Sequence, residues 1–276
     1  MEFKEIYDAK RAKVEEYLHK IMDSVKDNFK IKEAMEYSLF AGGKRIRPVL
    51  AMSVCEMLGG KEERVMPFAC ALELIHTYSL IHDDLPCMDD DDLRRGMPTS
   101  HKKFGEDMAL LTGDALQALA FEIMAQSDEN PLIILECIRT VAVAAGISGM
   151  CGGQELDLSG LRDTAEQLER INLLKTGALI AASCWVGAIV AGCDVEQMKK
   201  IGSYAKNIGL AFQVKDDILD IAGTREGIGK TTGTDSRKGI QTYASLLGLE
   251  DAEKLLEQYI EEYGFKFYRK FDRFYF

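Results

Sequence analysis

Apolar residues recur at three- and four-residue steps along most of the chain, which is the pattern of amphipathic helices. The clearest run begins at Val65 and ends at Leu80. Further runs with this period cover residues 3–26, 31–40, 104–126, 131–147, 165–192, 195–221 and 250–263. No segment alternates apolar and polar residues as a half-buried strand does. The pattern therefore predicts an all-α fold, a single-domain helical bundle over residues 1–276.

Composition narrows the class of protein. The chain has 34 basic and 45 acidic residues and a net charge of −11, which argues against binding to nucleic acid. Its seven cysteines form no C-x-x-C pair, which favours reduced thiols in a cytoplasmic protein. Residues 1–20 are charged throughout and do not resemble a signal peptide. Residues 176–193 carry no charge, but their Ala, Gly and Ser content favours a close-packed helix over membrane insertion.

An acidic cluster follows the clearest helical run. Residues 81–96 read IHDDLPCMDDDDLRRG, with six aspartates from Asp83 to Asp92. A solvated charge run is the ordinary explanation of such a segment. Here Pro86 should end the helix and fold Asp89 back towards Asp83, which brings carboxylates together. Oxygen ligands, rather than Cys or several His, select hard cations such as Mg²⁺.

A second acidic cluster, FQVKDDILD, occupies residues 212–220. Asp216 and Asp220 are four residues apart and share a helix face, with Phe212 one turn below and Asp217 beside them. Alone, this spacing is common on exposed helices. Two such clusters in one helical chain predict several Mg²⁺ ions between them, with the other ligands supplied by water and substrate phosphates. The implied substrate is a diphosphate.

Basic residues beside glycines predict anion sites. Residues 42–48 read GGKRIRP and place Lys44 and Arg47 on one face of a starting helix. Amides at a helix N-terminus attract anions, and Arg grips phosphate oxygens with a fork of donors. Further candidates are Arg94, Arg95, Lys175 with Thr176, and Lys230 in the Gly-rich segment 223–239. Together they suggest two anionic subsites, one dependent on metal and one purely basic.

These motifs resemble those of a known family. The segments GGKRIRP, IHTYSLIHDDLPCMDDDDLRRG, HKKFGE, LLTGDAL, GMCGGQELDL, KTGALI and GLAFQVKDDILDIAG are similar, in order and spacing, to those of trans-isoprenyl diphosphate synthases. The likeness covers roughly residues 30–235 and is greatest to bacterial farnesyl diphosphate synthases (geranyltranstransferases). It implies helices around a deep central cavity, a homodimer, and head-to-tail condensation of isopentenyl diphosphate with dimethylallyl or geranyl diphosphate.

The resemblance implies a role for each matching residue. Two or three Mg²⁺ ions would be held by Asp83, Asp84, Asp89, Asp216, Asp217 and Asp220. The allylic diphosphate would be contacted by Arg94, Lys175, Thr176, Gln213 and Lys230. The isopentenyl diphosphate would be bound by Gly43, Lys44, Arg47, His76 and Arg95. The catalytic residues would be Asp83, Asp84, Arg94, Lys175, Gln213, Asp216 and Lys230.

The implied mechanism is ionisation of the allylic diphosphate, assisted by Mg²⁺ and the cations, and attack by the isopentenyl double bond in an apolar cavity. The released diphosphate would accept the proton. Phe212 could face the allylic cation or fill the core. Tyr78 and Ser79 lie five and four residues before Asp83, so a bulky side chain there could form a floor for the growing chain. An aromatic residue at this position implies farnesyl diphosphate as the product, with core packing of Tyr78 as the alternative.

Two features depart from the family. Ile240 stands where a lysine near a diphosphate is expected, and residues 265–276, FKFYRKFDRFYF, form an aromatic tail without a clear helical period. They keep open a catalytically impaired subunit that only binds prenyl diphosphates. A geranylgeranyl diphosphate synthase and a terpene cyclase are further alternatives, although a cyclase needs no second anion site.

Overall fold

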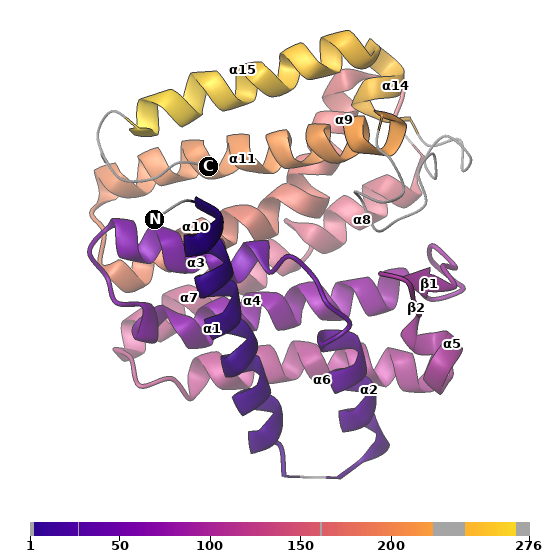
Figure 1. Ribbon diagram of the computed structural model, residues 1–276, viewed down its shortest axis with the longest axis vertical. Coiled ribbons are helices and arrows are strands. Elements are labelled where there is room, and N and C mark those ends of the chain that lie inside the picture. The colour runs from indigo at the N-terminus through magenta and orange to yellow at the C-terminus, as the bar shows by residue number, and fades with distance from the viewer. Residues whose placement is uncertain (1–2, 27, 161, 223–240, 269–276) are drawn as a thin grey trace. The chain divides into compact units, whose positions relative to one another are not determined.

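Helices dominate the computed structural model, and turns and one two-stranded hairpin connect them (Figure 1). The described residues are 3–26, 28–160, 162–222 and 241–268, without the side chains of residues 220, 222 and 261–268. The helices are α1 (Phe3–Ser24), α2 (Lys30–Leu39), α3 (Ile46–Met57), α4 (Glu62–Asp83), α5 (Ser100–Phe104), α6 (Glu106–Ala125), α7 (Pro131–Ala145), α8 (Met150–Leu158), α9 (Ala165–Asn172), the π-helix η1 (Leu173–Gly177), α10 (Ala178–Ala191), α11 (Val195–Ala222), α14 (Tyr243–Leu247) and α15 (Leu249–Tyr268). The hairpin pairs β1 (Leu93–Arg94) with β2 (Met97–Pro98) in antiparallel register. The all-α prediction is confirmed.

Contacts divide the chain into two compact units. The first consists of Met1–Ile138 with Ile189–Ala191, and the second of Arg139–Ala188 with Gly192–Phe276. The first aspartate motif belongs to the first unit and the second motif to the second unit. The single domain expected over residues 1–276 stays a prediction.

Helix α4 is the centre of the first unit. It packs against α3 and α6, and α2 also packs against α6. Every residue from Phe68 to Ile75 is buried, so α4 is enclosed on all sides instead of along one stripe. Each large apolar side chain buried there contributes about 1.5–3 kcal/mol to stability. The enclosed helix gives a fixed base to the residues at its C-terminal end.

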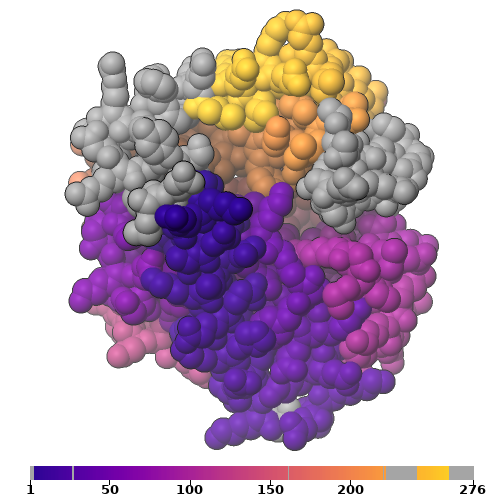
Figure 2. All heavy atoms as spheres, in the orientation of Figure 1, coloured from indigo at the N-terminus to yellow at the C-terminus, as the bar shows by residue number. Residues whose placement is uncertain are grey.

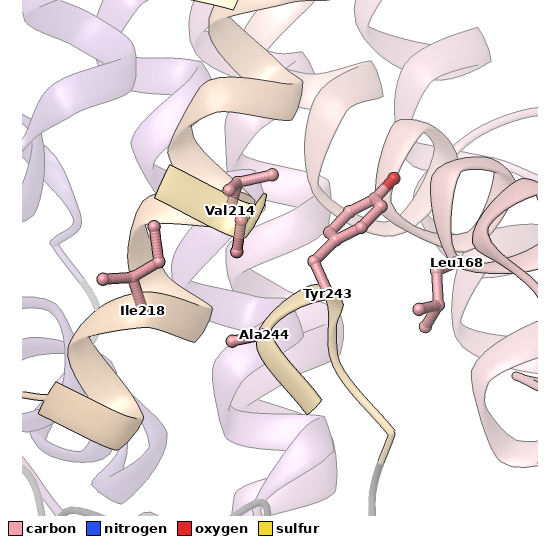
Figure 3. Close-up of a cluster of buried hydrophobic side chains, with 6 residues drawn as sticks. Leu168, Val214, Ile218, Tyr243 and Ala244 are labelled. Carbon is pink, nitrogen blue, oxygen red and sulfur yellow. The ribbon is translucent and has the colours of Figure 1, made fainter. Parts of the chain in front are cut away.

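Helix α11 is the centre of the second unit, as α4 is of the first. It packs against α9, η1, α14 and α15. A buried apolar cluster joins these helices: Leu168 of α9, Val214 and Ile218 of α11, Tyr243 and Ala244 of α14, and Ala252 of α15. The ring of Tyr243 extends from α14 into the space between Val214 and Leu168 (Figure 3). This ring thus helps to anchor the short helix α14 in the second unit.

A π-helical turn, η1, lies within the stretch that the sequence predicts as one regular helix over residues 165–192. Helices α9, η1 and α10 follow one another without a break. Two glycines allow backbone to approach this turn: a Cβ on Gly153 would overlap the backbone nitrogen of Lys175, and one on Gly209 would lie 2.9 Å from the Cα of Gly177. Helices α8 and α11 therefore contact η1 directly. Such turns are frequent at functional sites.

Helix α1 carries charged side chains on the surface of the first unit, where its indigo atoms face the viewer in Figure 2. Three stretches are long and apolar enough to cross a membrane by length and composition alone: Glu106–Ala125, Pro131–Leu158 and Ala165–Ala191. In the last of these, 61% of the apolar window is buried inside the protein. Residues 179–184 are all buried, so the close-packed helix expected over this uncharged stretch is confirmed.

The structure corrects three sequence predictions. Helix α3 begins only at Ile46, because Arg45 has left-handed backbone dihedrals, so Lys44 does not share a helix face with Arg47. Helix α15 extends to Tyr268 and includes the start of the aromatic tail, which was expected to lack helix. Residues 269–276 lie outside the described part. The hairpin was not predicted, since each of its strands has only two residues and cannot show an alternating pattern.

The contact between α8 and η1 predicts the effect of Gly153→Ala. The added methyl group has only backbone to displace, so we expect a loss of about 1–3 kcal/mol in unfolding free energy. Urea unfolding followed by circular dichroism measures it. Gly202→Ala on α11 is the matched control, because its Cβ would lie 3.4 Å from the Trp185 ring nitrogen, an ordinary contact. It should be neutral or stabilise by up to about 1 kcal/mol. Equal effects of the two substitutions would contradict the close approach.

Candidate active site

The first aspartate motif begins where α4 ends. The chain turns at Pro86, and the Asp89 amide donates a hydrogen bond to the Asp83 carbonyl at 2.8 Å. The predicted return of Asp89 towards Asp83 is therefore confirmed. Both residues are partly exposed, so their carboxylates can meet a ligand from solvent.

Asp84 differs from these neighbours because it is only 3% exposed. The Arg94 Nε lies 2.8 Å from each of its carboxylate oxygens. Burial raises the pKa of Asp84, and Arg94 opposes that rise. Against the effect of burial, the same hydrogen bonds raise the pKa of Arg94. Arg94 is thus fixed beside the motif, and Asp84 would reach a metal only by sharing its oxygens with this guanidinium. Its role as a ligand stays a prediction.

Arg45 fixes the loop of residues 42–48. Its φ of 54° is in the left-handed region, and its side chain is 1% exposed. The guanidinium donates to Glu73 at 2.8 Å, to Glu15 at 2.8 Å and to the Leu39 carbonyl at 2.6 Å. Removing one partner of such a buried pair typically costs about 3–5 kcal/mol. The ion pairs and the hydrogen bond of Arg45 therefore fix this loop, in addition to packing.

Arg95 reaches this loop from the turn of the hairpin. Its guanidinium donates to the Gly42 carbonyl, and a Cβ on Gly43 would lie 2.8 Å from it. Gly43 also has a φ of 137°, which favours glycine. The Tyr7 hydroxyl donates to the Lys44 carbonyl on the same loop. The structure thus brings together Gly43, Lys44 and Arg95, which the sequence assigns to the isopentenyl diphosphate site.

His76 of α4 lies within the field of these cations. Burial first, and then the charges of Arg47, Arg95, Arg94 and Arg45, hold the pKa of His76 well below its usual range. The imidazole is therefore neutral at pH 7 and would donate a hydrogen bond to an anion without adding charge. Burial and the neighbouring Arg45 also lower the pKa of Arg95. Mutual repulsion among these arginines would be relieved by a bound anion.

The second motif lies on α11, as predicted. Asp216 is exposed, whereas Asp217 is 4% exposed. One Asp217 oxygen accepts a hydrogen bond from Gln213 Nε2 at 2.9 Å, and the other accepts one from the Tyr243 backbone amide at 3.0 Å. The side chain of Asp220 lies outside the described residues. The adjacent aspartates of this motif therefore have different surroundings.

Lys175 and Thr176 lie on η1, one beside α8 and one beside α11. The Lys175 ammonium contacts an oxygen of Asp157 at 2.7 Å, and Arg162 pairs with the other oxygen. The Thr176 hydroxyl donates to Gln213 Oε1 at 3.3 Å. The structure thus connects three of the residues predicted for the allylic diphosphate, Lys175 and Thr176 along η1 and Gln213 through Thr176.

Tyr78 is buried within the first unit, and its ring meets that of His82 edge-on, with centroids 5.8 Å apart. His82 Nε2 lies 3.0 Å from the Leu110 carbonyl of α6. Ser79 is partly buried and donates to the His76 carbonyl at 2.9 Å. These contacts show packing of Tyr78 on the side of α4 that faces α6, and its part in chain length stays a prediction.

Three residues of this network were missed in the sequence: Arg45, Asp157 and Tyr243. Asp157 stands in the segment GMCGGQELDL, where an acidic residue near several glycines was an available signal. Arg45 lies between two residues that were selected. The Tyr243 contact uses a backbone amide, which no residue pattern reveals. Phe212 is partly buried on α11, and its role stays a prediction. Lys230, Ile240 and the Gly-rich segment 223–239 lie outside the described residues.

Within the described part of the chain, no three His, Cys, Asp or Glu side chains converge closely enough to hold a metal ion by themselves. The donors nevertheless fit Mg²⁺. Asp83, Asp89 and Asp216 offer carboxylate oxygens at partly or fully exposed positions. Mg²⁺ commonly uses one or two protein carboxylates and takes its other ligands from water and substrate phosphates.

The depressed pKa of His76 predicts a pH effect on stability. The unfolded chain binds this proton below about pH 6.5 and the folded chain does not, so stability falls as pH drops below that value. By pH 5.5 the loss from this residue reaches about 1.4 kcal/mol. His76→Gln should lose less stability than the native protein between pH 7.5 and pH 5.5, as measured by urea unfolding without substrate. Equal losses would mean that His76 titrates normally.

Comparison with known proteins places the chain in a family. The model of the polyprenyl synthetase family matches residues 28–269. The chain is 46% identical to farnesyl diphosphate synthase of Geobacillus stearothermophilus, over 90% of this chain and 85% of that protein. It is 47% identical to the large subunit 1 of the heterodimeric geranylgeranyl pyrophosphate synthase of Arabidopsis thaliana chloroplasts, over 88% of this chain and 69% of that protein.

Solved structures of similar proteins support the same family. An FPP/GFPP synthase from Zymomonas mobilis superimposes with a TM-score of 0.85 at 36% identity, over 97% of this chain and 92% of the other. A geranyltransferase from Helicobacter pylori, complexed with magnesium and isoprenyl diphosphate, superimposes with a TM-score of 0.82 at 35% identity, over 93% and 88% of the two chains. The shared family model, sequence and fold show that this chain belongs to the polyprenyl synthetase family of prenyltransferases.

Proposed function

We propose that the protein condenses isopentenyl diphosphate with dimethylallyl and then geranyl diphosphate to give farnesyl diphosphate. The observation that carries this proposal is the cation cluster around His76, in the same unit as the first aspartate motif. Arg47 and Arg95 belong to it, and the Arg95 guanidinium lies on the loop of residues 42–48, where it donates to the Gly42 carbonyl. A purely basic anion site beside a carboxylate motif suits a reaction of two diphosphates. A terpene cyclase, with one diphosphate, would need no such site.

In this proposal, different side chains bind the diphosphates of the two substrates. Arg47, Arg95 and neutral His76 bind the diphosphate of the isopentenyl substrate, which stays attached during the reaction. Arg94 and Lys175 stabilise the charge that develops on the allylic diphosphate as it leaves. Lys175 shares its ammonium between Asp157 and that diphosphate. Apolar surroundings keep water away from the allylic cation until the isopentenyl double bond attacks.

Magnesium completes the proposal. Asp83, Asp89 and Asp216 are the carboxylates that suit it best, because they are partly or fully exposed, whereas Asp84 and Asp217 are buried. When bound with the substrate, Mg²⁺ supplies positive charge that stabilises the departing diphosphate. The complex of the Helicobacter pylori relative with magnesium and isoprenyl diphosphate supports the use of Mg²⁺.

The proposed fifteen-carbon product is based on the aromatic side chain of Tyr78. The relatives are named for farnesyl and for geranylgeranyl products, so geranylgeranyl diphosphate is the alternative. A subunit that binds prenyl diphosphates without turnover is the second alternative, because Ile240 replaces the expected lysine. The paired and buried residues around both motifs favour a working enzyme.

We further propose a cytoplasmic homodimer. Exposed apolar residues on α7, Leu132, Leu135 and Val143, offer a surface for a second copy. All seven cysteines are free, which suits a reducing compartment. A heterodimer, as in the name of the Arabidopsis relative, is the competing assembly.

The test incubates the purified protein with Mg²⁺, dimethylallyl diphosphate and labelled isopentenyl diphosphate, and resolves the product after dephosphorylation. We expect a fifteen-carbon alcohol that disappears when EDTA is added or when Asp83 is changed to Ala. Asp92→Ala is the control for loss of a charge in the same segment, because Asp92 is exposed and paired with Lys102. It should keep the activity. No product from a folded protein would favour the binding subunit.

The Tyr78→Ala substitution tests whether the Tyr78 side chain limits the length of the growing prenyl chain. If Tyr78 limits the chain, its truncation lets the product grow to twenty carbons or more, which the same assay resolves. Tyr78→Phe keeps the ring and should still give fifteen carbons. Identical product length from the native protein and a folded Tyr78→Ala variant would assign Tyr78 to packing against α6 alone.

A further inference from the structure

Asp217 joins α11 to the start of α14. We infer that Asp217 is a positioning residue: its carboxylate holds the Tyr243 amide and, through Gln213, orients the Thr176 hydroxyl on η1. This role deepens the proposed prenyl transfer and rests on it, because Thr176 and Gln213 are assigned there to the allylic diphosphate. It replaces the expected role of Asp217 as a metal ligand.

The contacts of Asp217 account for both of its oxygens. One accepts from Gln213 Nε2 at 2.9 Å and the other from the Tyr243 amide at 3.0 Å, at a site that leaves the residue 4% exposed. A buried carboxylate needs such donors to remain charged. A metal ligand also needs an open approach, and the neighbouring Asp216 is the exposed member of the pair.

Helix α14 depends on this carboxylate for its first amide. Tyr243 is the first helical residue, so its N–H has no partner inside the helix. The Thr242 side chain accepts from the Ser245 amide at 3.2 Å, which leaves the Tyr243 amide to Asp217. The Tyr243 ring is 2% exposed and lies among the side chains of α9 and α11 (Figure 3). Amide and ring together fix α14 on α11.

Gln213 transmits the position of Asp217 to η1. A carboxylate only accepts hydrogen bonds, so the Gln213 amide must turn its Nε2 towards Asp217. Its Oε1 then faces Thr176 and accepts the hydroxyl at 3.3 Å. The charge of Asp217 therefore determines which way the Thr176 hydroxyl points. An Asn at position 217 would keep the contact with the Tyr243 amide through its oxygen, but its NH2 group would turn Gln213 over, so that Nε2 faces Thr176 and the hydroxyl must reverse.

The experiment compares Asp217→Asn, Asp217→Ala and Asp216→Asn in the full-length protein, by hydrogen exchange of peptides from residues 241–248 and by kinetics with dimethylallyl diphosphate. Asp217→Ala should raise the exchange rate of this segment about 10- to 100-fold, the effect of losing one hydrogen bond to a charged group. It should also raise KM for dimethylallyl diphosphate more than it lowers kcat. Asp217→Asn should restore the native exchange rate, because its oxygen still accepts the Tyr243 amide, but should keep the raised KM, because Gln213 and the Thr176 hydroxyl are reversed. Asp216→Asn should leave exchange unchanged and lower kcat.

The opposite pattern overturns the inference. If Asp217→Asn is as inactive as Asp216→Asn and neither Asp217 variant changes exchange at residues 241–248, the carboxylate acts through its charge on a metal. Should Asp217→Ala fail to fold, the comparison of the two Asn variants still decides, because they differ only in which adjacent carboxylate is neutralised. A native protein without prenyl transfer would refute the proposed function, whereas the exchange measurements would still test the link between Asp217 and Tyr243.

Discussion

Buried ion pairing around Arg45 is the constraint on which the first unit depends. The chain must bring Arg45, Arg47, Arg94 and Arg95 close enough to influence one histidine, and their repulsion opposes that arrangement. Glu73 makes it possible: it is the charged residue in the enclosed part of α4, and with Glu15 it neutralises the Arg45 guanidinium. One arginine is thereby used to build the loop, so that the others remain near a place where an anion can bind. The same pairing explains why α4, otherwise apolar between Phe68 and Ile75, includes a carboxylate.

The two aspartate motifs share an arrangement of exposed and buried carboxylates that is not visible in their sequences. In each pair of adjacent aspartates, the first is at least partly exposed and the second is buried and held by the protein. Asp84 is held by Arg94 and Asp217 by Gln213 and Tyr243. A helix turns by about 100° per residue, so adjacent positions necessarily point in different directions. One aspartate can therefore face solvent and substrate while its neighbour ties the motif to the fold.

Much of the fold could be predicted because it follows from local patterns. The three- and four-residue period gave the long helices within a few residues, and Pro86 predicted the return of Asp89 to Asp83. The contacts that define the site could not be predicted in this way. The Asp157 partner of Lys175 and the backbone partner of Asp217 come from segments distant in the chain, and their pairing depends on packing that has no sequence period. The left-handed conformation of Arg45 was also hidden, because it is stabilised by partners on α1, α2 and α4 instead of by its own preference.

The π-turn η1 has a consequence for how this segment tolerates change. A π-helical turn contains one residue more than the regular helix around it, and each residue in a regular helix adds about 100° of rotation. Removing one residue from Leu173–Gly177 would let α9 and α10 merge into a uniform helix. Because the wider turn absorbs the extra residue, the faces of α9 and α10 would stay in register, and the displacement would fall on the side chains of the turn itself. Lys175 and Thr176 would then leave their partners on α8 and α11, although every residue type in the motif could be retained. Length in this segment is therefore as restricted as residue identity.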